Sequence, residues 1–150
     1  MESNRCPFCD PDIKPSIFAQ SPNFMAVYNI APVLAGHSMI IPKSHIEHLS
    51  ELNPELYIEM MEFTRFITVK LCTAFKTNDF NWSLQEGISA GQTVNHLHLH
   101  ILLRNHGDLN EPGDWYKLLS NSTELDSLNR PRLNKKQISE AVAFLKPHFE

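Results

Sequence analysis

Three histidines occupy every second position near residue 100, at His96, His98 and His100. In an extended strand, alternate side chains point to the same face, and successive ones lie roughly 6–7 Å apart. Leucine fills the positions between the histidines, as expected for the opposite, buried face. Clustered polar groups on a rigid element are more often functional than merely solvated. The spacing therefore predicts a functional site and disfavours a plain solvent-exposed strand.

Two chemistries suit such a strand. Imidazole is the commonest metal ligand, but a single strand usually directs only two alternate side chains to one ion. A neutral imidazole is also a competent nucleophile toward phosphorus, and an ordinary pKa of about 6.5 leaves it mostly neutral at pH 7. Neighbouring imidazoles can protonate a leaving group or stabilise phosphoryl oxygens. The Gly-containing turn Ala90-Gly91-Gln92-Thr93, just upstream, is a plausible anion cradle.

The bulk composition fits one globular domain spanning residues 1–150. Hydrophobic residues make up 42% of the chain and charged residues 20%. The net charge of -4 disfavours a nucleic-acid partner, because nucleic-acid-binding domains are normally basic. We expect no signal peptide, no membrane segment and, from three cysteines, a reducing cytoplasmic location without a disulfide framework.

Hydrophobic patterning predicts an α+β domain with a mainly antiparallel sheet. Apolar residues recur in steps of three and four after Asn53-Pro54-Glu55, which indicates one long helix to about Lys76. A second amphipathic helix is expected at 134–147, and a surface loop with a short helix at Trp115–Leu119 is expected within 105–132. The predicted strands are 24–30, 39–42, 80–86 and 94–103.

Several motifs resemble those of a known superfamily in order and spacing. They are Val27-Tyr28-Asn29, Gly36-His37, Ile41-Pro42, Trp82 to Gly87, Ala90 to Val94 and the histidines from His96 to His100. Together they resemble the histidine-triad superfamily, and most closely its fragile-histidine-triad branch of diadenosine polyphosphate hydrolases. This resemblance implies a five-stranded sheet with one long helix and a C-terminal helix, and a homodimer whose sheets join.

The resemblance also implies a mechanism. His98 would attack the α-phosphate of a dinucleoside polyphosphate, and water would later release a nucleoside monophosphate from the covalent nucleotidyl-histidine. His100 would contact the scissile phosphate, and His96 would be an orienting neighbour or a metal ligand. The remaining substrate-binding residues implied are Asn29 at the ribose and, at the phosphates, Gln85, Gly91, Gln92, Thr93 and Val94.

The segment after the triad resembles the family poorly, so the substrate stays open. An adenosine phosphoramidate hydrolase would use the same nucleophile on a P–N bond, and a phosphorylase would replace water with phosphate. A nucleotide-binding regulatory protein is the alternative outside the enzyme class, although binding alone does not require a placed nucleophile.

Cys6 and Cys9 form a CxxC pair. The pair is consistent with free thiols, a redox motif or half of a zinc site, but the strand-to-helix context of redox motifs is missing. No redox cofactor is expected. Several branches of the superfamily combine such a pair with two histidines, which here correspond to His45 and His96; His48 is a competitor for His45. Four protein ligands would make the zinc structural.

Overall fold

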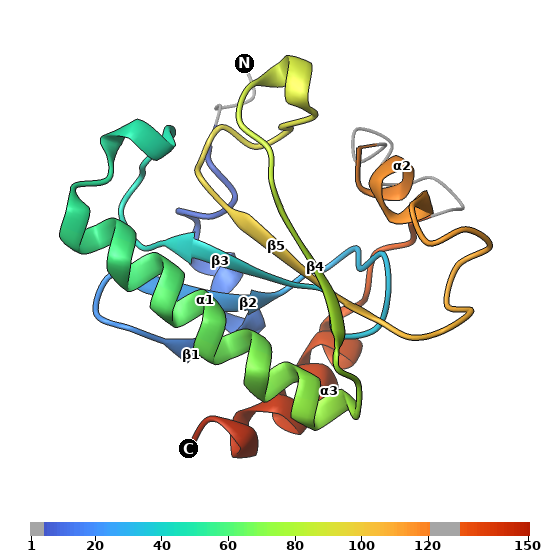
Figure 1. Cartoon of the computed structure of the whole chain (residues 1–150). Helices are drawn as coiled ribbons and strands as arrows, with labels where there is room; N and C mark the ends of the chain where they lie inside the picture. Colours follow the sequence, from blue (N-terminus) through green and yellow to red (C-terminus); the bar gives the residue numbers. More distant parts are fainter. Residues whose placement is uncertain (1–4, 121–129) are drawn as a thin grey trace.

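A computed structural model of the chain describes residues 5–120 and 130–150. Its centre is a five-stranded antiparallel sheet in the order β1-β2-β3-β5-β4 (Figure 1). The strands are β1 Ile17–Gln20, β2 Phe24–Tyr28, β3 Ser38–Pro42, β4 Asp79–Leu84 and β5 Leu99–Arg104. The α+β class, the antiparallel five-stranded sheet and the two main helices are thus confirmed.

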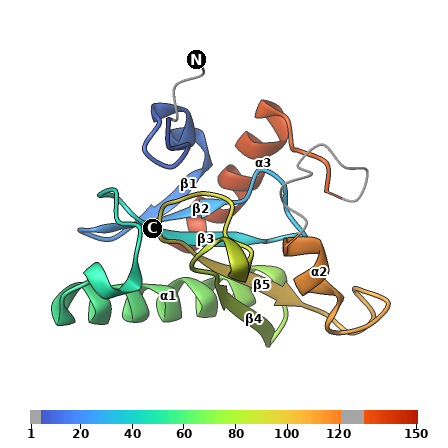
Figure 2. The same ribbon diagram turned by 90° about the horizontal axis from the view of Figure 1, so that it is seen from above.

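Alternation along the strands gives the sheet two different faces. One face carries Ala26, Ile40 and Ile101 against the long helix, within the main core. The other carries Val27, Met39 and Ile41, which pack under the N-terminal segment. Figure 2 shows the long helix on one side of the sheet and the N-terminal segment on the other. His100 has the opposite parity to Leu99 and Ile101, so the histidine face is the one without the long helix.

The long helix α1 spans Pro54–Phe75 and ends where the sequence predicts. Asn53 caps its start, because its side chain accepts a hydrogen bond from the Leu56 N–H at 2.9 Å. Its buried apolar stripe contains Met60, Phe63, Ile67 and Leu71. In the described part of the chain, no helix is long and apolar enough to cross a bilayer.

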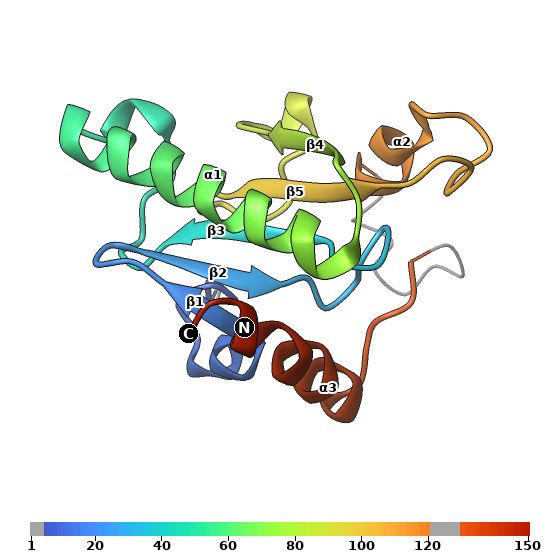
Figure 3. The same cartoon turned by 60° about the horizontal axis from the view of Figure 1, so that its bottom comes forward.

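Two shorter helices follow the sheet. Helix α2 spans Asp114–Ser120 and helix α3 spans Lys135–Leu145. Asn134 caps α3, whose buried side chains are Ile138, Val142 and Leu145. Figure 3 shows α3 beside β1, where these side chains complete the main core at that edge of the sheet.

Two expectations about strands need correction. β5 begins at Leu99 and not at Val94, so His96 and His98 precede the paired strand. The backbone of residues 94–98 is not paired in the sheet. The Leu97 N–H, for example, donates to the Ile46 carbonyl at 2.6 Å. The edge strand β1 falls in none of the predicted strands. It has only four residues and follows the 3-10 helix Pro11–Ser16, so its pattern is too short to stand out.

Candidate active site and metal cluster

A cavity of about 220 Å³ lies beside the start of β5, on the face of the sheet away from α1. His100 lies on β5 between its cross-strand partners Met39 of β3 and Ser83 of β4. Of the triad, His98 and His100 line the cavity and His96 does not. The other lining residues are Pro7, Phe8, Asn29, Ile30, Ala31, Met39, Gln85, Gly91, Thr93, Val94, Leu119, Arg130 and Arg132.

The ring of His98 is held in one tautomer. Its Nδ1 lies 2.7 Å from the carbonyl oxygen of His96. A carbonyl only accepts, so Nδ1 carries the proton and Nε2 of the neutral ring keeps its electron pair. Burial lowers the pKa of His98, which favours that neutral form. His98 therefore presents an unprotonated nitrogen in the cavity, as a nucleophile requires.

His100 belongs to a different chain of hydrogen bonds. We call this chain, which consists of Val33, His37 and His100, the buried relay. The Val33 N–H donates to Nδ1 of His37 at 3.0 Å. Neutral His37 therefore carries its proton on Nε2, which lies 2.9 Å from Nδ1 of His100. Burial lowers the pKa of both rings well below the ordinary histidine value. His100 is thereby left with a proton on Nε2 and serves as a hydrogen-bond donor.

His96 does not line the cavity, and its ring nitrogens have partners different from those of the other two histidines. Its Nε2 donates to the Pro42 carbonyl at 2.9 Å, so its Nδ1 is the nitrogen with a free electron pair. That Nδ1 lies 3.3 Å from the sulfur of Cys6 and 3.6 Å from that of Cys9. This position is compatible with both roles expected for His96, an orienting neighbour of His98 and a metal ligand. Its link to the chemistry is the carbonyl that orients His98.

Cys6, Cys9, His45 and His96 form one group, the thiol cluster, with all four ligand atoms within 4.8 Å of one another. Nδ1 of His45 lies 3.3 Å from the sulfur of Cys9. Ligand atoms of a tetrahedral zinc site lie roughly 3.3–3.8 Å apart, given Zn–S of about 2.3 Å and Zn–N of about 2.0–2.1 Å. The residues therefore fit zinc in donor type and number, and the three sulfur–nitrogen distances given above, 3.3 to 3.6 Å, lie within this range.

The surroundings also distinguish His45 from His48. Nε2 of His45 lies 3.0 Å from a carboxylate oxygen of Glu47, which is the usual outer contact of a zinc-ligating imidazole. His48 instead lies 3.1 Å from Glu86, and the other oxygen of Glu86 accepts from the Leu49 N–H. His48 belongs to that separate contact and not to the cluster.

On the phosphate side, Gln85 is 7% exposed, and among the described residues its Nε2 is a buried polar atom without a hydrogen-bond partner. An unsatisfied buried donor at a cavity is poised for an acceptor on a ligand. Gln92 does not line the cavity: its side chain accepts from the Gly87 N–H and donates to the Val94 carbonyl. It closes the loop that presents Gly91, Thr93 and Val94.

Some residues at this site were not assigned a role from the sequence. Phe8 lies edge-on to His98, with ring centroids 5.1 Å apart, and also lines an adjoining, largely apolar cavity of about 340 Å³. Arg130 reaches the cavity from the segment that resembles the family poorly. Asn29 lines the cavity as expected, and its Oδ1 accepts from the Ala31 N–H at 2.8 Å. The CxxC pair was the available signal for Phe8, which lies within it.

Comparison with known proteins identifies the family. Residues 10–107 match the HIT domain family, which covers more than half of the chain. The chain belongs to the HIT family. The resemblance inferred from the triad is thereby confirmed, and the unmatched part of the HIT chain includes the CxxC pair, α2, Arg130 and α3.

Several HIT relatives have named activities. The chain is 30% identical over 128 residues to the nitrilase and fragile histidine triad fusion protein NitFhit of Caenorhabditis elegans, covering 85% of this chain and 29% of that protein. It is 31% identical over 95 residues to a bis(5'-nucleosyl)-tetraphosphatase of Schizosaccharomyces pombe, covering 63% and 52%. A bis(5'-adenosyl)-triphosphatase of Dictyostelium discoideum is 28% identical over 134 residues, covering 89% and 85%. The chain thus spans about half or less of the first two relatives.

The fold agrees as well. The crystal structure of Plasmodium falciparum diadenosine triphosphate hydrolase superimposes with a TM-score of 0.73 at 24% identity, covering 90% of this chain and 76% of that one.

Proposed function

We propose that the protein is a nucleotidyl hydrolase that cleaves dinucleoside polyphosphates through a covalent intermediate on His98. The observation that carries this proposal is the tautomer of His98: its Nδ1 proton is tied to the His96 carbonyl, which leaves Nε2 free in a cavity rich in hydrogen-bond donors. The relatives named as bis(5'-nucleosyl)-tetraphosphatase and bis(5'-adenosyl)-triphosphatase support the same substrate class.

The proposed reaction has two displacements at one phosphorus. Nε2 of His98 attacks the α-phosphorus, the P–O bond to the leaving nucleotide breaks, and that oxygen departs with the electron pair. Water then attacks the same phosphorus, the P–N bond breaks with its electron pair returning to Nε2, and a water proton is released. Donors from His100, Gln85 and the backbone at Gly91 and Thr93 stabilise the phosphoryl oxygens in both steps.

The adjoining apolar cavity suits the nucleoside. Its apolar lining residues include Phe8, Ile13, Val27 and Ile30, of which Phe8 and Ile30 also line the catalytic cavity, and its charged ones are Arg5, Asp10 and Asp12. A purine ring buries its faces against apolar side chains, so a base here would leave the α-phosphate near His98. Asn29, on the wall of the catalytic cavity, is the proposed ribose-side residue.

The thiol cluster is the proposed site of a structural zinc ion held by Cys6, Cys9, His45 and His96. Bound zinc would supply a cross-link and no open coordination position for substrate, because all four ligands come from the protein. Cys6 and Cys9 flank Phe8, so the cross-link would fix a wall of the catalytic cavity.

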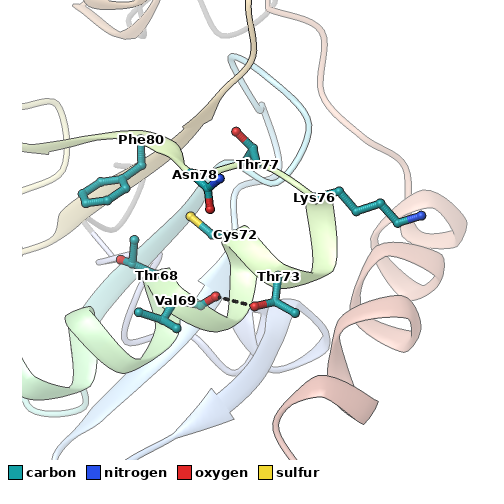
Figure 4. Close-up of a pocket in the computed structure, with 8 residues that line it drawn as sticks. All are labelled: Thr68, Val69, Cys72, Thr73, Lys76, Thr77, Asn78 and Phe80. Atoms are coloured by element: carbon teal, nitrogen blue, oxygen red, sulfur yellow. Dashed lines mark hydrogen bonds between the residues drawn. The ribbon is translucent and has the colours of Figure 1, made fainter.

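A homodimer is also part of the proposal. β4 lies at the edge of the sheet, and in the described chain its outer side has no partner strand. Beside it lies a hollow of about 440 Å³, formed by the last turns of α1, the following turn and the start of β4 (Figure 4). Phe80 on this strand is 45% exposed, which supports a second copy packing there. Phe80→Glu should lower the sedimentation coefficient from dimer to monomer.

The decisive experiment compares His98→Ala with His106→Ala, an exposed histidine outside the cavity. Diadenosine tri- and tetraphosphate and adenosine phosphoramidate are offered with and without added phosphate, and products are separated by chromatography. We expect His98→Ala to lose at least about 10⁴-fold in kcat while nucleotide binding changes little, and His106→Ala to match wild type. Retained turnover in His98→Ala would refute the covalent route; the product profile separates hydrolase, phosphoramidase and phosphorylase.

A further inference from the structure

Arg130 is a buried cation in the wall of the catalytic cavity. It is 4% exposed and lies beyond the residues that match the HIT family. Its Nε donates to the Ala31 carbonyl at 2.8 Å, and one terminal nitrogen lies 3.3 and 3.4 Å from the carbonyls of Leu118 and Leu119. These contacts hold the guanidinium between the loop after β2 and the end of α2.

The charge of this guanidinium has no acidic counterpart among the described residues. The partners just named are all neutral carbonyls, and no carboxylate lines the cavity within the described chain. Burial is what lowers the pKa of Arg130. A buried, uncompensated cation is costly unless a ligand supplies the missing negative charge.

Arg130 is also placed at a particular end of the site. After burial, which is the largest cause, its positive charge contributes to the lowered pKa of His37 and of His100. Its Nε bonds the Ala31 carbonyl, two residues before Val33 of the buried relay, so the cation lies toward the relay. Nε2 of Gln85, which has no hydrogen-bond partner among the described residues, belongs to the same cavity wall.

We propose that Arg130 is the cationic group of an anion subsite for the phosphate next to the attacked one, so that the substrate must contain linked phosphoryl groups. This inference rests on the proposed function and narrows its substrate class. When the P–O bond to the leaving group breaks, the departing oxygen keeps the electron pair and gains negative charge. A fixed guanidinium stabilises that charge and needs no proton transfer.

The proposal separates two substrates that share the nucleophile. The leaving group of a dinucleoside polyphosphate is a nucleoside polyphosphate anion, which Arg130 can stabilise. An adenosine phosphoramidate has an amine leaving group and no second phosphate. Arg130 should therefore accelerate cleavage of the dinucleoside polyphosphate and change cleavage of the phosphoramidate very little. An arginine that only holds α2 against the loop at Ala31 would affect both reactions equally.

The test measures kcat/KM of the full-length protein for diadenosine triphosphate and for adenosine phosphoramidate in three variants. Arg130→Gln removes the charge, Arg130→Lys keeps it without the planar fork, and Arg65→Gln removes an exposed arginine of α1 as the control. We expect Arg130→Gln to lose about 100-fold or more on the triphosphate, in line with loss of one transition-state donor, and at most about 3-fold on the phosphoramidate. Arg130→Lys should lie between, and Arg65→Gln should match wild type.

Equal losses on both substrates, or no loss on either, would overturn the subsite. The ratio of kcat/KM for diadenosine triphosphate to kcat/KM for adenosine phosphoramidate does not depend on the fraction of the variant that is folded. If Arg130→Gln does not fold, the same ratio is taken from Arg130→Lys. If wild type cleaves neither substrate, the proposed function fails separately. Calorimetric titration with ADP and AMP then decides the subsite: a preference for ADP that Arg130→Lys weakens supports it, and equal affinities overturn it.

Discussion

The two ends of the histidine segment have the same residue type at the same spacing, yet opposite surroundings. At the His96 end, the thiol cluster gathers two cysteines and two histidines at the base of the N-terminal segment, and Cys9 and His45 are exposed. At the His100 end, the buried relay and Arg130 enclose the imidazole within the protein. His98 lies between them, oriented by a backbone carbonyl from the first end and facing donors from the second.

This difference shows that the partners of each ring, and not the triad spacing, determine what the ring can do. A histidine whose Nε2 proton is engaged offers Nδ1 to a metal, and one whose Nδ1 proton is engaged offers Nε2 to phosphorus. The first end should therefore govern metal content and stability, and the second should govern turnover. The predictions below set these two outcomes against each other.

Among the effects that separate the two ends, the largest is expected at the thiol cluster. Cys9→Ala should abolish stoichiometric zinc in protein never exposed to chelator, because it removes one of four ligands. If free zinc is about 1,000 times its Kd, the linked loss in stability is about 4 kcal/mol, or on the order of 10 °C in Tm. Cys72→Ala is the matched control, since Cys72 lies on α1 outside the cluster. Full zinc content in Cys9→Ala would rule out the assigned ligand set.

At the other end, His37→Ala should lower kcat by about 100-fold without changing zinc content. His37 does not line the cavity; its Nε2 lies 2.9 Å from Nδ1 of His100 and 3.4 Å from Nδ2 of Asn29, so its loss removes the group that fixes the His100 tautomer. Because this is a positioning role, KM should change little and His37→Gln, which restores an N–H donor, should recover part of kcat. A change confined to KM, or a loss of zinc, would contradict the separation of the two ends.

The backbone conformation at Gly36 positions His37 in the buried relay, and a substitution at Gly36 tests this. Its φ of +86° is in the left-handed region, and an added Cβ would lie 2.8 Å from Cδ1 of the buried Leu103. Gly36→Ala should therefore cost about 2 kcal/mol, the sum of backbone strain and a clash in the core. Gly107→Ala has φ +75° and open space around the new Cβ, so it should cost only about 1 kcal/mol. Equal Tm values for the two variants would exclude the clash.

The sequence was most informative where local pattern and chemistry coincide. Helix α1 was predicted from its cap to its last turn, because Asn53-Pro54 and the apolar spacing are local signals. The residues of the thiol cluster were named, but their proximity depends on contacts far apart in the chain, such as Cys6 with His96. The start of β5 was misplaced because periodicity does not reveal that the Leu97 N–H bonds to Ile46 outside the ladder. Arg130 had no signal, since only folding brings it to Ala31.

The smallest expected effect concerns pH. His37 is fully buried, and it faces His100 of β5 and the positive charge of Arg130, with His98 further along. Burial and these charges disfavour the second ring proton that makes His37 cationic, so its folded pKa lies well below 6.5, while the unfolded chain takes up this second proton near pH 6.5. The unfolded state then binds more protons, so the contribution is fully present above about pH 6.5 and is lost as pH falls. In EDTA, the free energy of unfolding of wild type should fall more steeply between pH 6.5 and 5 than that of His37→Gln, by up to about 1.4 kcal/mol per pH unit. Parallel curves would mean that His37 is protonated in the folded protein, and the buried relay could not hold His100 in the tautomer that donates from Nε2.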